Sequence, residues 1–288
     1  GPEPGSKLRD NFQTHSKDIN FSLFYFASDE GVAGQKKYQL LLEGAEFADQ
    51  NEFEAVWTPE RHFGEFGGLY PNPVVTSSMI AAVTKNVKIR AGSCVLPLHS
   101  PIRVAEDWAV VDNLSNGRVG LAFASGWQPN DFVIAPQNYA ERHKILNDSI
   151  DTVQRLWCGE SIQMANAIGE TIDIYTKPRP IQEKLPVWLT IGGNPKAFIS
   201  AGEQGLNILT HMLGQTQEEL AEKIALYRQA WNAAVHQGEG RVPLMLPSFI
   251  ADNESYVIEK VKVPFKNYLR QSLSLLQGTS LTEGMNMD

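Results

Sequence analysis

The chain has 288 residues, enough for one large α/β domain or two ordinary ones. Its 42% hydrophobic and 20% charged residues are typical of a globular protein and argue against disorder. The net charge of −8, without runs of lysine or arginine, argues against a nucleic-acid partner. No apolar run is long enough for a membrane helix, and the two cysteines, Cys94 and Cys158, form no disulfide framework or thiolate metal motif. We therefore expect a protein of the reducing cytoplasm.

From residue 19 onward, short apolar runs alternate with longer amphipathic ones. The patterns predict a strand over 19–26, then helix 35–51, strand 53–58, helix 73–86, strand 87–96, helix 101–117, strand 118–125 and helix 139–157. Short alternating stretches then interrupt this rhythm over 158–185, which we interpret as an insertion. The alternation resumes with strand 186–193, helix 195–204, strand 206–211, helix 216–236, strand 242–252 and helix 254–276.

Seven β-α units in succession, with no linker between them, predict an α/β protein with a parallel sheet. At this length a (β/α)8 TIM barrel is favoured over an open doubly wound sheet. The eighth unit is missing from the pattern, because the segment after the last helix is polar. We expect a barrel domain over residues 19–276 that contains the insertion. A cloning scar (1–6) and a lead-in (7–18) precede it, and a tail (277–288) follows it.

Chemically suggestive residues follow the predicted strands, where a barrel places its active site. Glu60, Arg61 and His62 come after the second strand, and they suit proton transfer and anion binding, although an ion pair that braces the loop is the alternative. The double glycine of TIGGNPKAF (190–198) suits a phosphate at a helix start and equally a tight turn without a ligand. His99 is more typical of a cap or a surface group.

Three other kinds of site lack support in the sequence. No two histidines lie three or four residues apart and no ligand trio has metal-site spacing, so we expect no metal. A G-x-S-x-G nucleophile elbow and a G-x-G-x-x-G dinucleotide fingerprint are also absent from the sequence.

Taken together, FEAVWTPERHFGEFGG, VKIRAGSCVLPLHSPIRVAEDWAVVDNLSNGRVGLAFASGWQPNDF and LPVWLTIGGNP closely resemble the bacterial luciferase-like flavin monooxygenases, over residues 19–276. The motifs are most similar to a subgroup that works in polyketide and nonribosomal peptide assembly lines. The resemblance implies a barrel that binds reduced FMN from a separate flavin reductase and reacts it with O2. The resulting C4a-peroxyflavin would oxygenate a substrate tethered to an acyl or peptidyl carrier protein in antibiotic biosynthesis. Family members often dimerise, which leaves a homodimer open.

The resemblance also implies site residues. Those matched to the flavin contacts are Gly92 and Ser93, with a non-prolyl cis peptide, then Ala124, Ser125, Gly126, Trp127, Ile191, Gly192, Gly193, Asn194, Thr210 and His211. The chain departs from the luciferases at Ser125, where they carry an arginine for the phosphate. It departs again at Arg61, which replaces the first, catalytic histidine of a pair. We expect Arg61 to stabilise the peroxide or orient the substrate, with His62 as proton donor and Glu60 beside them.

Three alternatives stay open at this stage. An F420-dependent dehydrogenase on the same barrel would transfer hydride and ignore O2. A non-catalytic flavin-binding module is a second option, which the missing eighth unit supports. A metal-dependent barrel hydrolase is weaker, because ligand spacing is lacking.

Overall fold

The computed structural model describes residues 19–26, 28 and 34–276. The predicted cloning scar, lead-in and tail lie outside these residues. Within them, seven parallel strands form one sheet in the order β1-β2-β3-β4-β7-β8-β9. The strands are β1 (Ser22–Phe24), β2 (Ala55–Thr58), β3 (Lys88–Val95), β4 (Val119–Ala124), β7 (Val187–Thr190), β8 (Asn207–His211) and β9 (Leu244–Met245). Since neighbours in the sheet follow chain order, α1 to α6 lie in the crossovers between adjacent parallel strands, and α7 follows the last strand.

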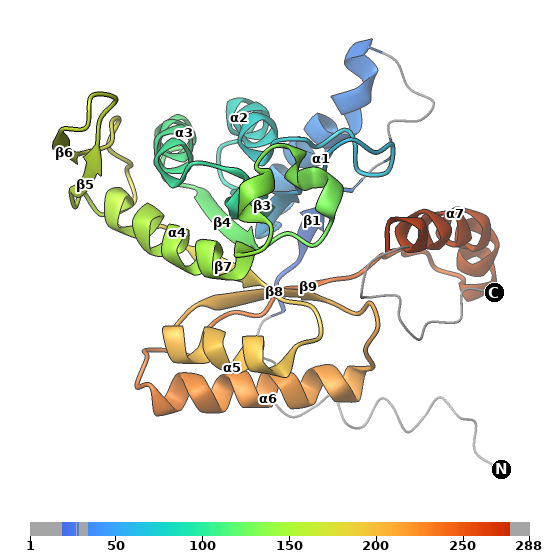
Figure 1. Cartoon of the computed structure of the whole chain (residues 1–288). Coiled ribbons are helices and arrows are strands. Elements are labelled where there is room, and N and C mark those ends of the chain that lie inside the picture. Colours follow the sequence, from blue (N-terminus) through green and yellow to red (C-terminus); the bar gives the residue numbers. More distant parts are fainter. Residues whose placement is uncertain (1–18, 27, 29–33, 277–288) are drawn as a thin grey trace.

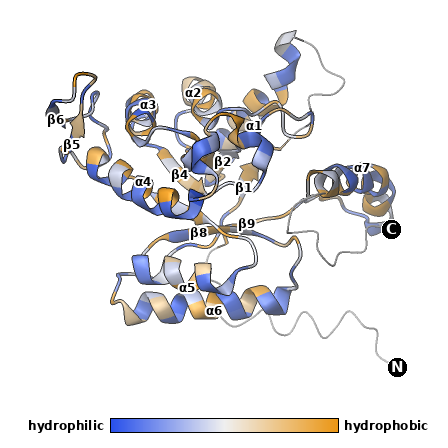
Figure 2. Ribbon diagram, in the orientation of Figure 1, coloured by the Kyte–Doolittle hydropathy of each residue, from blue (hydrophilic) through white to orange (hydrophobic). Residues whose placement is uncertain are grey.

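Helices alternate with the strands, as the amphipathic patterns predict. Figure 1 shows α1 to α4 together on one side of the strands, with α5 and α6 on the other and α7 set apart. The helices are α1 (Gln39–Gln50) after the 3-10 helix η1 (Gly34–Tyr38), then α2 (Pro73–Val83), α3 (Pro101–Leu114), α4 (Arg142–Trp157), α5 (Pro195–Gln204), α6 (Gln217–Ala233) and α7 (Glu254–Leu276). In Figure 2, blue hydrophilic stretches alternate with orange hydrophobic ones along α4 and α6, as expected for helices with one buried face.

The sheet is rolled, so its two faces have different neighbours. Alternate side chains such as Val56, Leu121 and Ile208 pack against the helices in the large core. The intervening side chains form a second cluster of Ala55, Trp57, Ala122, Trp188 and Leu209. Phe24 of one edge strand and Met245 of the other both pack on this second cluster. Contact of both edges with one interior cluster is the mark of a barrel, and it confirms the predicted fold class.

The predicted insertion is an antiparallel hairpin of β5 (Ile162–Ala165) and β6 (Thr171–Ile174), separate from the main sheet. Figure 1 shows it beyond the end of α4. Its residues are mostly exposed, which accounts for the loss of the helix-strand rhythm there.

The seventh strand is much shorter than the predicted 242–252, because β9 holds only Leu244–Met245. Pro243 and Pro247 flank it, and proline has no N–H to donate to a sheet. In the part of the chain that the structure describes, β9 pairs with β8 alone and β1 with β2 alone, so no eighth strand joins the two edges.

Candidate active site

The carboxyl ends of the strands form a mouth of small, part-exposed side chains. By strand alternation Ala124, Thr190 and His211 share the interior face with the second cluster, and Ser93 is hydrogen-bonded to Thr190 through their hydroxyls. Below them Trp57 and Trp188 meet edge to face, with ring centroids 5.4 Å apart. The mouth therefore has a polar rim over an aromatic floor.

The peptide between Gly92 and Ser93 is cis, as the resemblance predicted. A Cβ at residue 92 would lie 2.7 Å from the Phe24 ring and 3.0 Å from the Trp57 ring. Only glycine lets β3 pass so close to these interior rings, so Gly92 is required by the floor of the mouth.

Glu60 is the centre of a hydrogen-bonded cluster at the start of the loop after β2. Its Oε1 lies 2.7 Å from His62 Nε2 and 2.7 Å from His99 Nε2, and its Oε2 accepts from the Val95 N–H at 2.7 Å. The Glu60 side chain is fully buried, while His62 is 10% exposed and His99 26%. The sequence predicted Glu60 and His62 as site residues, and it treated His99 as a cap or a surface group.

The contacts of this cluster explain its protonation. Burial alone would raise the pKa of Glu60, but the hydrogen bonds from His62 and His99 outweigh it and hold that pKa below its usual value. Burial alone would lower the pKa of His99, yet the hydrogen bond and charge of Glu60, with a smaller contribution from Asp107, raise it. Glu60 is thus a carboxylate that favours charge on His99.

Arg61 is engaged in a buried ion pair, as the loop-bracing alternative allowed, but its partner is Asp131 and not the neighbouring Glu60. Its Nη1 lies 2.7 Å from both carboxylate oxygens of Asp131, which belongs to the 3-10 helix η3 (Pro129–Val133) after β4. The Trp127 ring lies 5.6 Å from the guanidinium carbon. Gly67 makes room for the stem, because a Cβ there would lie 2.8 Å from Arg61 Cγ. Arg61 therefore joins the loops after β2 and β4, and its charge is partly compensated.

The loop after β7 has the features of an anion cradle. Asn194 caps α5 by accepting from the Lys196 N–H, and Pro195 begins the helix. A Cβ on Gly193 would lie 3.7 Å from Lys223 Nζ, an ammonium on α6 held by Gln215 Oε1 at 2.8 Å. The sequence predicted the glycines and missed this lysine, which lies 30 residues further along the chain.

Some of the predicted cofactor residues face away from the mouth. Ile191 packs in the helix-facing core, and alternation from Ile208 puts the fully buried Thr210 on that same face. His211 faces the interior instead, with its Nδ1 accepting from the Leu213 N–H and its Nε2 close to Gly192. Burial lowers the pKa of His211, so it is a neutral donor at this rim.

The loop after β4 is shaped by packing as well. Gly126 has φ of 81°, and a Cβ there would meet the Phe132 ring at 2.7 Å. Ser125 is part-exposed beside it, and Arg142 donates to the Gly126 carbonyl at 3.1 Å. The guanidinium carbon of Arg142 also lies 4.5 Å from the centroid of the Tyr139 ring, so this guanidinium already has partners within the loop.

Among the residues that the structure describes, folding also brings together a group of side chains of the kinds that bind metals, which sequence spacing did not show. Donor atoms of Glu60, Cys94 and His99 lie within 4.8 Å of one another. Hydrogen bonds already account for the closeness of Glu60 and His99. Burial, with the charge of Glu60, raises the pKa of the Cys94 thiol well above its usual value. The cluster therefore has the chemistry of a hydrogen-bonded network around a protonated thiol.

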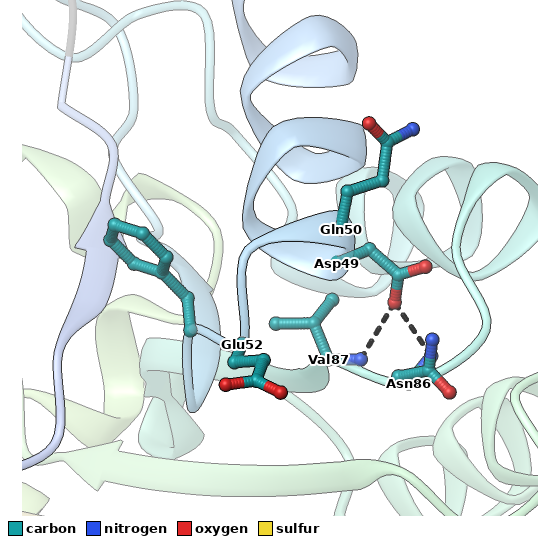
Figure 3. Close-up of a pocket in the computed structure, with 6 residues that line it drawn as sticks. Asp49, Gln50, Glu52, Asn86 and Val87 are labelled. Carbon is teal, nitrogen blue, oxygen red and sulfur yellow. Dashed lines mark hydrogen bonds between the residues drawn. The ribbon is translucent and has the colours of Figure 1, made fainter.

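A cavity of about 480 Å³ lies elsewhere, between the end of α1 and the start of β3. Figure 3 shows Asp49 there, with its carboxylate turned to the backbone of Asn86 and Val87. The carboxylate accepts three backbone N–H groups, from Lys85, Asn86 and Val87. Because this is the amino end of β3, the cavity is on the barrel face opposite the mouth, and Asp49 stabilises the turn.

The model of the luciferase-like monooxygenase family matches residues 19–280. The chain belongs to the luciferase-like monooxygenase family. Among curated proteins of that kind it is 25% identical, over 242 residues, to the oxygenase component of a flavin-dependent trigonelline monooxygenase from Acinetobacter baylyi, with 82% of this chain and 66% of that protein covered. It is 28% identical, over 200 residues, to an F420-dependent glucose-6-phosphate dehydrogenase from Amycolatopsis mediterranei, with 63% and 59% covered.

Solved structures agree on the fold. The monooxygenase RslO1 from Streptomyces bottropensis superposes with a TM-score of 0.80 at 24% identity, over 90% of this chain and 80% of that one. The oxygenating constituent of 3,6-diketocamphane monooxygenase from Pseudomonas putida, in complex with FMN, superposes with a TM-score of 0.73 at 16% identity. The match covers 93% of this chain and 80% of that one. The chain spans less than two thirds of the length of the two curated relatives. No described helix is both long and apolar enough to cross a membrane.

The residues of the mouth fit a flavin mononucleotide. The side chains at the ends of β3, β4 and β7 are the small Ser93, Ala124 and Thr190, which obstruct a flat ring above the tryptophan floor less than larger side chains would. Gly193 leaves open a position next to an ammonium group, which suits a phosphate. Lys223 is the cation that the structure shows beside this loop, whereas residue 125, where the luciferases by the resemblance carry an arginine, is a serine.

Proposed function

We propose that this chain is the FMNH2- and O2-dependent oxygenase of a two-component system, which acts on a carrier-tethered acyl or aminoacyl intermediate of natural-product biosynthesis. The observation that carries the proposal is the mouth itself, a polar rim of small residues over an aromatic floor with an ammonium beside Gly193. Family membership, and a relative named as the oxygenase component of a flavin-dependent monooxygenase, support it.

Reduced FMN, when bound, would supply the electrons that activate O2. We assign its ring to the interior side of Ser93, Ala124 and Thr190, and its phosphate to the loop of Gly192, Gly193 and Asn194. Lys223 would neutralise the phosphate charge. His211 would donate from Nε2 at the same rim, because Nδ1 is already an acceptor.

His62 would exchange the proton that oxygen transfer requires. Its Nε2 is held by Glu60, which leaves Nδ1 as the atom that exchanges protons with the reacting groups. Arg61 would hold the loops after β2 and β4 in register through Asp131 and orient the substrate with what remains of its charge. Phe66 packs on Tyr268 of α7 at 5.3 Å, so α7 extends the wall beside this loop.

The substrate class rests on the sequence motifs that resemble assembly-line monooxygenases. It is tested by incubating candidate carrier proteins, loaded with acyl or aminoacyl groups, with the chain, FMN, a flavin reductase and O2. We expect intact-mass analysis to show a gain of one oxygen atom on the loaded carrier and none on the unloaded one. Oxygenation of a free small molecule with no effect on any carrier would overturn the tethered-substrate part alone.

An F420-dependent dehydrogenase is the second candidate, because one relative carries that name. Equilibrium binding separates the two: we expect FMN to bind at least tenfold more tightly than F420. Hydride transfer from reduced F420 without O2 uptake would favour the dehydrogenase. A non-catalytic module would bind FMN and leave the rate of oxidation of free reduced FMN unchanged.

A further inference from the structure

Arg90 of β3 is buried inside the barrel, two residues before Gly92 and so further from the mouth. It pairs in register with Trp57, and its guanidinium carbon lies 5.3 Å from the centroid of the Trp57 ring and 4.1 Å from that of Trp188. Only 7% of Arg90 and 2% of Trp188 is exposed. Stacking on aromatic faces stabilises a guanidinium, but it leaves the N–H groups of that guanidinium in need of acceptors.

Two buried donors at this place, Arg90 Nε and Trp188 Nε1, have no acceptor among the residues that the structure describes. Since the guanidinium carbon lies 4.1 Å from the centroid of the Trp188 ring, both donors lie in one small space. Asn207, which pairs in register with Trp188, does not serve them. Its Oδ1 accepts from the Arg241 N–H and its Nδ2 donates to the Val187 carbonyl. Arginine and tryptophan side chains can only donate, so the space suits an acceptor.

The charge around these donors is positive. The carboxylate of Glu54 faces Arg90, but 3.9 Å separates its Oε1 from Arg90 Nη2, which is longer than a hydrogen bond. The same oxygen is hydrogen-bonded to Arg241, so one carboxylate serves two guanidinium groups. Burial lowers the pKa of Arg90 to about 10, and the attraction of Glu54 offsets only part of this effect. A negatively charged acceptor therefore suits the space better than a water molecule does.

We propose that a small inorganic anion of the halide type, such as chloride, binds inside the barrel between Arg90 Nε and Trp188 Nε1. The anion has to be small, because the walls are closely packed: a Cβ at Gly120, opposite Arg90 on β4, would meet the Trp188 ring at 2.8 Å. A halide accepts from both donors at once and compensates the guanidinium charge. The inference does not rest on the proposed function, since its test needs neither flavin nor O2.

The test follows the indole N–H groups of the full chain, labelled with ¹⁵N-tryptophan, by NMR. Sodium chloride replaces sodium gluconate at constant ionic strength, so that a small anion takes the place of a large one. We expect a saturable shift of the Trp188 signal, which is identified by its loss in Trp188→Phe. The Trp157 indole donates to the Gln182 carbonyl and should not move, which makes it an internal control.

Variants separate a bound anion from a general effect of salt. Arg90→Met should weaken the chloride response of Trp188 at least tenfold, whereas Arg103→Met, which removes an exposed arginine of α3, should leave it unchanged. Where Arg90→Met folds poorly, crystals of the wild-type chain grown with bromide should show an anomalous peak within hydrogen-bonding distance of both donors. A Trp188 signal that ignores chloride, or that responds equally in Arg90→Met, would overturn the proposal. A bromide peak without a saturable shift would mean binding at crystal concentration only and would overturn it too.

Discussion

Replacing Arg61 by methionine separates two roles for this residue, a brace between loops and a group that acts on the substrate. The Arg61 and Asp131 side chains are 7% and 11% exposed, with 2.7 Å between Nη1 and the carboxylate. Removing one partner of a fully buried pair costs about 3–5 kcal/mol. Burial raises the pKa of Asp131, so the orphaned carboxyl can take up a proton, and we expect the low end, about 3 kcal/mol.

The assay is a double-mutant cycle by urea unfolding, with Arg61→Met, Asp131→Asn and the double variant. We expect a coupling energy of about 2 kcal/mol, and a Tm about 6 °C lower for Arg61→Met. FMN affinity should stay within a few fold. Arg155→Met serves as the control, because that arginine is paired with Glu160 on the surface, and its unfolding midpoint should not move. Unchanged stability with a 100-fold loss of oxygenation would refute the brace and make Arg61 a catalytic group.

Three other perturbations test the remaining parts of the site. Gly193→Trp obstructs the proposed phosphate position and Lys223→Met removes its positive charge, so each should weaken FMN binding about tenfold, as measured by fluorescence quenching. Gly193→Ala should have a much smaller effect. Gly92→Ala should lower the free energy of unfolding by about 1–3 kcal/mol, because its methyl group meets two interior rings; an unchanged urea midpoint would contradict this packing. The urea concentration at the unfolding midpoint should decrease both as pH falls below neutrality and as pH rises above it. Glu60 stabilises the fold above about pH 4.3, and this effect is lost as pH drops through its lowered pKa. His99 stabilises the fold below about pH 6.5, and this effect is lost as pH rises through its raised pKa. His99→Gln should therefore reduce the decrease in the urea midpoint at alkaline pH.

Local signals were sufficient for the order of the helices and strands, but not for every bound. The predicted bounds of α5 and α7 coincide with those observed, and for α5 the reason is local: Asn194 caps it, Pro195 begins it and Gly205 ends it in the left-handed region. The strand predicted over 242–252 was too long, because an apolar run says nothing about whether a neighbouring strand is there to accept its hydrogen bonds.

The sequence by itself determined the α/β alternation and the family, and it predicted Glu60, His62 and the glycine loop as candidate site residues at the carboxyl ends of their strands. Only the tertiary structure decided which partners complete the site: His99 and Asp131 lie 39 and 70 residues from Glu60 and Arg61, respectively. It also decided that Thr210 faces the helices and that Lys223 stands beside Gly193. Strand order and register bring such residues together, and a one-residue change of register would turn every side chain of a strand to its other face.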